Sequence, residues 1–291
     1  MRTTFRSFAK INLHLQVMGR RDDGYHELLT VFQTVDLTDL LTLELVGSDI
    51  QLVVSEGNAP EGPENLIYRA AQGFLERWAP AAGVRVDLKK RIPIGGGLGG
   101  GSSDAATVLL GLQKMLATPA SRDDLLDLAS QLGADVPYFL WGGTACGRGR
   151  GDWIECLPDL EERPVCLVTP PIEISTAEVF GALQASDEPL RPEYVHEEWT
   201  QGPDWHAMDL GWNDLEQRVM NRFPVMRDVY NALVEAGASV VRLSGTGATL
   251  FAFFEGGTEP PGLLAKLPSG SRVVQTRTLT RSSLDRLFVV R

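Results

Sequence analysis

A glycine-rich stretch constrains the fold of this chain more than any other feature. Residues 93–106 read Pro-Ile-Gly-Gly-Gly-Leu-Gly-Gly-Gly-Ser-Ser-Asp-Ala-Ala, with six glycines. Immediately before it, Val84, Val86 and Leu88 alternate with polar residues, which indicates a strand. Residues 105–115 are rich in Ala and Leu and indicate a helix directly after it. The chain is therefore expected to run from a strand through a bare turn into the N-terminus of a helix.

Such a turn favours phosphate binding. The first N–H groups of a helix lack internal partners, and the helix dipole places partial positive charge there. Glycines let a large anion approach the backbone and allow a positive φ where the turn needs one. Ser102 and Ser103 can cap the helix or bind phosphate oxygens. The stretch predicts a cradle for phosphate groups.

Three other interpretations of the glycines are weaker. A Walker loop needs a lysine after the last glycine, and two serines stand there instead. Gly95, Gly97 and Gly100 match the dinucleotide pattern, but that fold needs a second parallel strand after the helix. The next pattern here is another helix, residues 121–132, opened by a capping box. A flexible linker seldom lies between a regular strand and a regular helix.

Composition excludes several classes of protein. The 291 residues suffice for one large domain or two ordinary ones, and 43% hydrophobic content indicates a true core. A net charge of −11 argues against nucleic acid or an anionic membrane as partner. No secretory signal or membrane span is expected. The 3 cysteines and 4 histidines show no metal-ligand spacing, so we expect no protein metal site and a cytoplasmic location.

The remaining patterns predict an α+β fold in two layers. Asn65 is expected to cap a helix over residues 66–78. Residues 28–45 read as two strands that are broken near residues 36–39. An acidic, proline-bounded segment after residue 157 predicts a domain boundary there, and residues 187–203 read as a polar surface excursion.

Two segments contain candidate site residues. Residues 9–17 alternate strictly, which places Lys10, Asn12 and His14 on one face of a strand. This row is either a solvated face or the lining of a polar cleft. Asp135, between a helix end and a proline that favours an extended Val136, is either a turn residue or a base in a cleft.

Six segments, spread over nearly the whole chain, together resemble the GHMP kinase family. They are residues 9–13, 19–26, 95–106, 133–137, 213–216 and 244–247. The resemblance implies an enzyme that phosphorylates small-molecule hydroxyls from ATP, with Mg²⁺ on the phosphates. It also implies two lobes, an ATP-binding domain over residues 1–157 and a smaller α+β domain over residues 158–291, with the active site in the cleft between them.

The resemblance also implies roles for individual residues. Asp135 would take the proton from the attacking hydroxyl, and Lys10 would be the cation beside it. The residues implied at ATP are Pro93, Ile94, Gly95, Gly96, Gly97, Leu98, Gly99, Gly100, Gly101, Ser102 and Ser103 at the phosphates, with Asn65 and Lys90 at the adenosine end. Those implied at a cytidine diphosphate part of the substrate are Asn12, Tyr25, His26, Thr176 and Phe180.

Some questions stay open at this point. Arg148 and Arg150 do not match the family pattern, and residues 187–206 are longer and more acidic than expected. Homoserine, mevalonate or a sugar is an alternative substrate, and a non-catalytic nucleotide sensor is an alternative function. Oligomeric state, and whether Tyr25 or Phe180 does more of the stacking, do not follow from the sequence.

Overall fold

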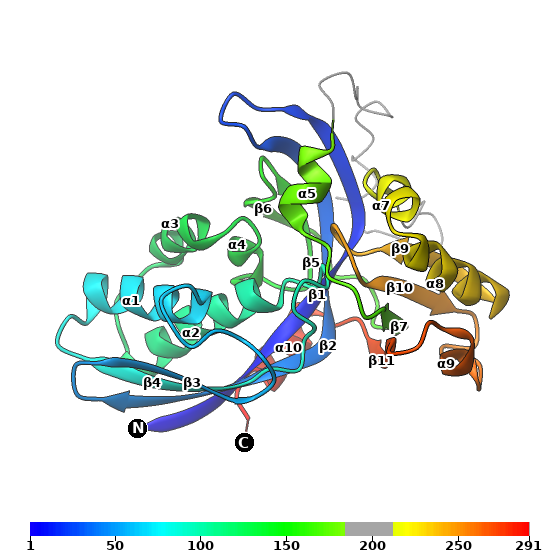
Figure 1. Ribbon diagram of the computed structural model, residues 1–291. Helices are drawn as coiled ribbons and strands as arrows, with labels where there is room; N and C mark the ends of the chain where they lie inside the picture. The colour runs from blue at the N-terminus through cyan, green and yellow to red at the C-terminus, as the bar shows by residue number, and fades with distance from the viewer. Residues whose placement is uncertain (184–211, 291) are drawn as a thin grey trace.

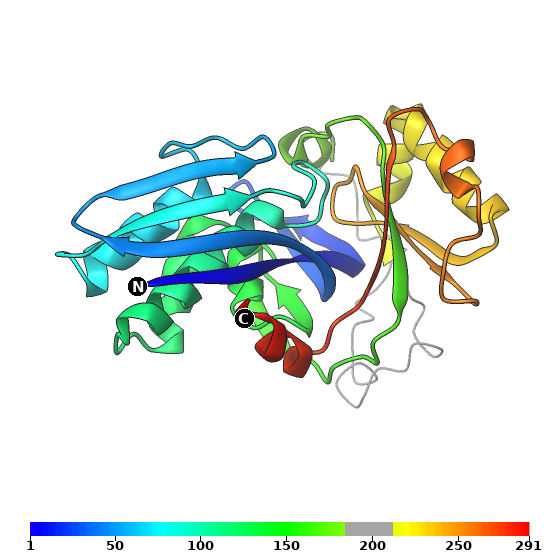
Figure 2. The ribbon, with the colours of Figure 1, turned by 90° about the horizontal axis from the view of Figure 1, so that it is seen from below.

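Two β-sheets lie side by side in the computed structural model, which describes residues 1–183 and 212–290 (Figures 1 and 2). Within these residues the larger sheet has seven strands: β1 (Arg2–Arg20), β2 (His26–Val46), β3 (Ile50–Glu56), β4 (Gly83–Lys89), β5 (Thr144–Arg148), β6 (Trp153–Cys156) and β8 (Trp212–Asn213). Their order is β3-β4-β2-β1-β8, and β5 pairs with both β2 and β6. The long antiparallel pair β1 and β2 lies at the centre of the molecule and reaches both halves of the chain.

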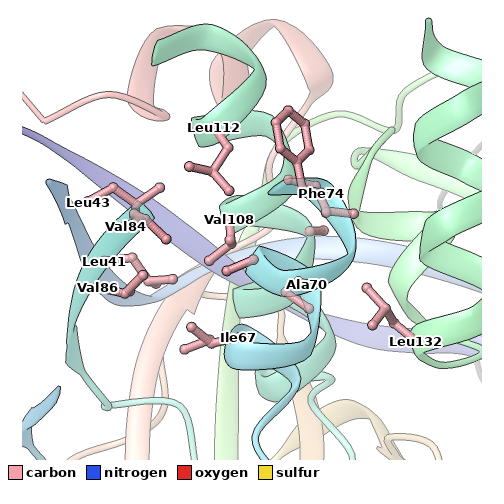
Figure 3. Packing of buried hydrophobic residues seen from close by; sticks show 14 of the residues in the cluster. Leu41, Leu43, Ile67, Ala70, Phe74, Val84, Val86, Val108, Leu112 and Leu132 are labelled. Carbon is pink, nitrogen blue, oxygen red and sulfur yellow. The ribbon is translucent and has the colours of Figure 1, made fainter. Parts of the chain in front are cut away.

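Helices cover one face of this sheet (Figure 1). They are α1 (Leu66–Trp78), α2 (Gly100–Leu116), α3 (Arg122–Leu132) and α4 (Val136–Phe139). Side chains from β2 and β4, such as Leu41 and Val86, pack against α1 and α2 in a dry core (Figure 3). Two predicted caps are confirmed, because Asn65 accepts from the Ile67 N–H and Ser121 forms the capping box that opens α3.

The two middle strands of the smaller sheet are buried on both faces. Its strands are β7 (Pro164–Thr169), β9 (Ala238–Leu243), β10 (Leu250–Phe254) and β11 (Arg272–Arg277), in the order β11-β7-β10-β9. On β10, Leu250 and Ala252 point into the core shared with α7 (Glu216–Arg222) and α8 (Pro224–Glu235). Phe251 and Phe253 point the other way, into a core shared with β1 and β2. Because successive side chains of β10 point to opposite faces, this strand contributes to both cores and so connects the two halves of the chain.

The predicted break between two strands at residues 36–39 is wrong. β2 is continuous from residue 26 to residue 46, and the break in its pattern is a bulge. Its pairing jumps from Phe8 opposite Thr38 to Ala9 opposite Val35, so β2 carries extra residues there. The same bulge precedes the buried Asp39, whose contacts are described below.

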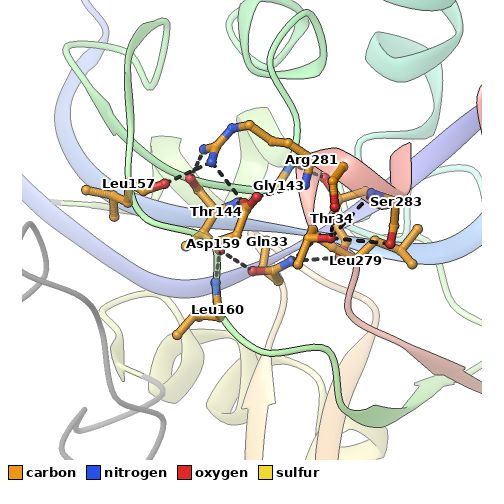
Figure 4. A network of polar contacts seen from close by, with 12 residues as sticks. Gln33, Thr34, Gly143, Thr144, Leu157, Asp159, Leu160, Leu279, Arg281 and Ser283 are labelled. Atoms are coloured by element: carbon orange, nitrogen blue, oxygen red, sulfur yellow. Dashed lines mark hydrogen bonds and ion pairs between the residues drawn. The ribbon is translucent and has the colours of Figure 1, made fainter. Parts of the chain in front are cut away.

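The end of the chain returns to the first half, where it forms α10 (Arg281–Leu287) (Figure 2). A polar network anchors it (Figure 4). The Arg281 guanidinium donates to the Leu157 carbonyl and the Asp159 carboxylate, both at 2.9 Å. The Gln33 amide donates to the Leu279 carbonyl at 2.8 Å. No helix was predicted here, since its seven residues show no long apolar period.

The division into residues 1–157 and 158–291 stays a prediction. The proposed excursion at 187–203 and the acidic segment at 187–206 lie outside the described residues. None of the helices in the described ranges is long and apolar enough to cross a membrane.

Candidate active site

The glycine stretch ends in an open helix N-terminus. α2 begins at Gly100, earlier than the predicted residue 105, and Gly99 precedes it with φ +68° and no side-chain cap. Helical geometry leaves the N–H groups of Gly100, Gly101 and Ser102 without partners inside the helix. Capping by a serine is therefore a wrong prediction, because a glycine occupies the cap position.

Ser103 does not face the open turn. Its side chain is buried, its hydroxyl accepts from the Ser7 hydroxyl at 2.8 Å, and its N–H donates to Gly99. The hydroxyl thus ties α2 to β1 and lies behind the cradle rather than in it.

A second glycine turn, over residues 244–247, packs directly against the first. A Cβ on Gly97, whose φ is +72°, would lie 2.1 Å from the Ser244 carbonyl oxygen. The Ser244 hydroxyl donates to the Gly97 carbonyl at 2.9 Å, and the Thr249 N–H donates to Gly96 at 3.1 Å. Glycine is required at residue 97 both for its backbone angle and for this close approach.

Lys10 and Asp135 lie together. The Lys10 Nζ is 3.5 Å from an Asp135 carboxylate oxygen and donates to the Asn12 amide oxygen at 2.5 Å. The lysine side chain is 4% exposed, whereas that of Asp135 is 33% exposed, so the carboxylate is open to a substrate. Asp135 stands at the start of α4, and Val136 is helical, so the expectation of an extended Val136 is wrong.

Hydrogen bonds fix the amide beside this pair. The Asn12 Nδ2 donates to the Thr30 hydroxyl at 2.8 Å, which in turn donates to the His14 carbonyl at 2.7 Å. The amide oxygen of Asn12 is thereby turned toward the lysine. The sequence left open whether this face of β1 is solvated or lines a cleft. In the structure, Lys10 and Asn12 are both buried and line the cleft.

Aromatic and hydroxyl side chains line another wall of the same cleft. The rings of His26 and Phe180 stack at 5.3 Å between centroids and 30° between planes. α5 (Thr176–Gly181) carries both Phe180 and Thr176, whose hydroxyl lies 3.0 Å from that of Thr246. Partial burial, with the nearby Arg20 charge, lowers the pKa of His26 and favours its neutral ring.

Lys90 lies beneath the cradle, but its ammonium is already bound. Buried carboxylates of Asp39 and Asp104 both contact it, the second at 2.8 Å. Asp39 also accepts the N–H groups of Arg91 at 2.5 Å and Ile92 at 2.8 Å. Since the Lys90 N–H donates to the Glu56 carbonyl, the methylene groups of Lys90 are the part of the residue that can contact a ligand. Asp39 itself was missed, because one acid in a strand gives no sequence signal.

Asp104 is expected to make stability depend on pH. Burial, only partly offset by Lys90 and reinforced by Asp39, raises its pKa from 3.8 to about 7. The folded chain thus holds a proton that the unfolded chain releases, so this contribution to stability is full below about pH 4 and is lost as the pH rises to about 7. Asp104→Asn should flatten that slope in urea unfolding, whereas Asp123→Asn, an exposed acid, should not. An unaltered slope in Asp104→Asn would assign the effect to other groups.

One cavity of about 950 Å³ is lined by the glycine stretch, by the Lys10–Asp135 pair and by the stacked rings of His26 and Phe180. Of the predicted site residues it includes Lys10, Asn12, Tyr25, His26, Asn65, Lys90, Pro93, Ile94, Gly95, Gly96, Gly97, Leu98, Gly99, Gly100, Gly101, Ser102, Asp135, Thr176 and Phe180. Ser103 is absent from the wall, and Arg20, Arg150 and Thr246 join it without having been predicted. Among the residues that the structure describes, no three acidic, His or Cys side chains gather as a metal site.

Two domain profiles match the sequence. The GHMP kinases N terminal domain matches residues 65–143, and the GHMP kinases C terminal domain matches residues 206–270. A 4-diphosphocytidyl-2-C-methyl-D-erythritol kinase of Desulfotalea psychrophila is 41% identical over 263 residues, which cover 87% of this chain and 86% of the relative. The chain belongs to the GHMP kinase family. A relative of the same name from Geobacter metallireducens is 36% identical over 279 residues, 95% of this chain and 98% of its own length.

Solved structures agree with this assignment. A crystal structure of 4-(cytidine 5'-diphospho)-2C-methyl-D-erythritol kinase has a TM-score of 0.79 and 36% identity, with 94% of this chain and 98% of that one covered. A homoserine kinase from Cytophaga hutchinsonii has a TM-score of 0.64 at 17% identity, covering 96% and 95%, and shows the fold alone. The predicted family and the α+β fold are confirmed, and membership of a kinase family implies ATP as co-substrate.

Proposed function

We propose that this chain transfers the γ-phosphoryl group of ATP to the 2-hydroxyl of 4-diphosphocytidyl-2-C-methyl-D-erythritol, in the non-mevalonate route to isoprenoid precursors. The observation that carries the proposal is a single cavity lined by a phosphate cradle, a lysine–aspartate pair and stacked rings. Relatives that bear this substrate in their name match the chain over most of its length. The cytoplasmic location, and the absence of nucleic-acid or membrane partners, stay predictions from the sequence.

The cradle suits the triphosphate. Free N–H groups at Gly100, Gly101 and Ser102, with the positive end of the α2 dipole, attract phosphate oxygens. Gly97 and the Ser244 turn fix the shape of the loop before the nucleotide arrives. Asn65 and the methylene groups of Lys90 lie on the wall where the adenosine end would rest. Phosphoryl transfer depends mainly on such positioning and on neutralised charge.

Magnesium fits this site as an ion that enters with ATP. Mg²⁺ is usually held by one or two protein oxygens together with the substrate phosphates, and beside the cradle the cavity wall offers the Ser102 hydroxyl. The described residues form no dedicated cage of carboxylates. When bound, the ion would neutralise charge on the phosphates.

Lys10 and Asp135 act on the hydroxyl and the transferring group. The partly exposed carboxylate of Asp135 accepts the proton of the attacking hydroxyl. The Lys10 ammonium, oriented by the Asn12 amide, stabilises negative charge that develops beside it. The neutral His26, Phe180 and Tyr25 receive the cytosine, and base stacking on an aromatic ring typically contributes about 1–3 kcal/mol.

A substrate comparison tests the proposed function. The purified enzyme with ATP and Mg²⁺ is expected to phosphorylate 4-diphosphocytidyl-2-C-methyl-D-erythritol at least about 1,000-fold more efficiently, in kcat/KM, than homoserine or mevalonate. The reason is that neither competitor carries a base to fill the aromatic wall. ATP consumption and product mass are the measurements. Turnover of homoserine or mevalonate without turnover of the cytidylyl compound would overturn the proposal, and ATP binding without any turnover would favour a sensor.

A further inference from the structure

Arg150 connects three parts of the molecule at the mouth of the cavity. It lies in the turn between β5 and β6, and its guanidinium binds the Asp152 carboxylate at 2.6 and 3.0 Å. The same group donates to the Ser130 carbonyl on α3 at 3.4 Å. Its Cζ lies over the Tyr25 ring, 5.1 Å from the ring centroid. Both Arg150 and Tyr25 line the cavity.

Among the described residues, the structure shows few other contacts of the Tyr25 ring. Its backbone is fixed in the β1–β2 turn, where the Arg21 N–H donates to the Tyr25 carbonyl at 2.8 Å and the Tyr25 N–H donates to Asp23 at 3.1 Å. The residue is nevertheless 56% exposed and belongs to no buried cluster among the described residues. A cation over an aromatic face is attracted to it, so Arg150 is the group that supports the ring from one side.

The arginine is itself held in place. Its Nε and one terminal nitrogen both donate to the same carboxylate oxygen of Asp152, which anchors one edge of the guanidinium. Hydrogen bonding to Asp152, ahead of the interaction with Tyr25, raises the pKa of Arg150 further above its usual value. An isolated surface ion pair would explain the Asp152 contact but neither the position over Tyr25 nor the place on the cavity wall.

We propose that Arg150 is a positioning residue that sets specificity for the acceptor: held by Asp152, it fixes the Tyr25 ring as a wall on which the pyrimidine of a cytidine diphosphate compound stacks. This inference rests on the proposed function. Arg150 then acts on binding of the acceptor rather than on ATP or on the transfer step. It also gives a role to one of the two arginines that the family pattern left unexplained.

Steady-state kinetics with each substrate varied in turn tests this role. Arg150→Met is expected to raise KM for the cytidylyl acceptor about 3–30-fold, the range of one cation–π contact, while KM for ATP and kcat stay within about 2-fold. Arg150→Lys keeps a cation and should recover part of the loss. Arg148→Met is the matched control, because Arg148 does not line the cavity, and it should change neither KM.

A double-mutant cycle separates positioning from general support of the fold. In a Tyr25→Ala background, Arg150→Met should have little further effect on the acceptor KM, because the ring through which it acts is gone. An undiminished effect in that background, or equal losses for ATP and acceptor, would overturn the inference. So would a wild-type acceptor KM in Arg150→Met. Failure of the wild-type enzyme to use the cytidylyl compound would instead overturn the proposed function, and this inference with it.

Discussion

Asp135→Asn is expected to lower kcat about 100- to 10,000-fold, the usual contribution of a general base. The amide keeps the size of the side chain and its place at the start of α4, but it cannot take a proton from the attacking hydroxyl. It also cannot form the ion pair with Lys10, 3.5 Å away. ATP affinity, measured by calorimetry, should change by less than about 3-fold, because the phosphates are held by N–H groups of α2.

Two variants sharpen this test. Asp123→Asn, at an exposed acid in the first turn of α3, removes the same charge at a distance and should leave kcat unchanged. Lys10→Met, combined with Asp135→Asn, should cost less than the sum of the two single changes, since the residues act as a pair. If kcat of Asp135→Asn equals that of the wild type, Asp135 has no part in proton transfer. If ATP affinity falls as far as kcat, its role is in binding.

Sequence patterns predicted those parts of the site that are local. The strand before the glycines, the open helix after them and the cap at Asn65 all follow from residues that are close along the chain. The closeness of Lys10 to Asp135 was implied only by the family resemblance. No period or motif relates a residue in β1 to one at the start of α4.

What escaped prediction depends on contacts between distant segments. The turn at Gly97 needs a glycine partly because Ser244, from the other half of the chain, lies against it. In the sequence, Asp39 indicates a break in a strand. In the structure, it follows a bulge in a continuous strand, and its buried carboxylate accepts the N–H groups of residues 91 and 92. The same limit hid the two carboxylates that hold the Lys90 ammonium, since no local pattern relates Asp39 or Asp104 to Lys90.

Lys90→Met is expected to lower the free energy of unfolding by about 3–5 kcal/mol, as measured by urea denaturation at pH 7.5. Methionine fills similar volume but leaves Asp39 and Asp104, which are 0% and 3% exposed, without their shared cation. Arg91→Met is the matched control. That neighbouring cation pairs with Glu56 at 3.3 Å in a half-exposed position, so its loss should cost less than about 1 kcal/mol.

A second change identifies the cause of this loss. Adding Asp104→Asn to Lys90→Met removes one of the two buried acids that have lost their cation and should restore part of the stability. A double variant no more stable than Lys90→Met would mean that packing, not charge, is what the lysine supplies.

Asp39 binds both the Lys90 ammonium and the backbone N–H groups that lead into the glycine turn, so ATP affinity of Lys90→Met should fall together with its stability. Lost stability with wild-type ATP affinity would show that the cluster joins sheet to helix without shaping the phosphate cradle.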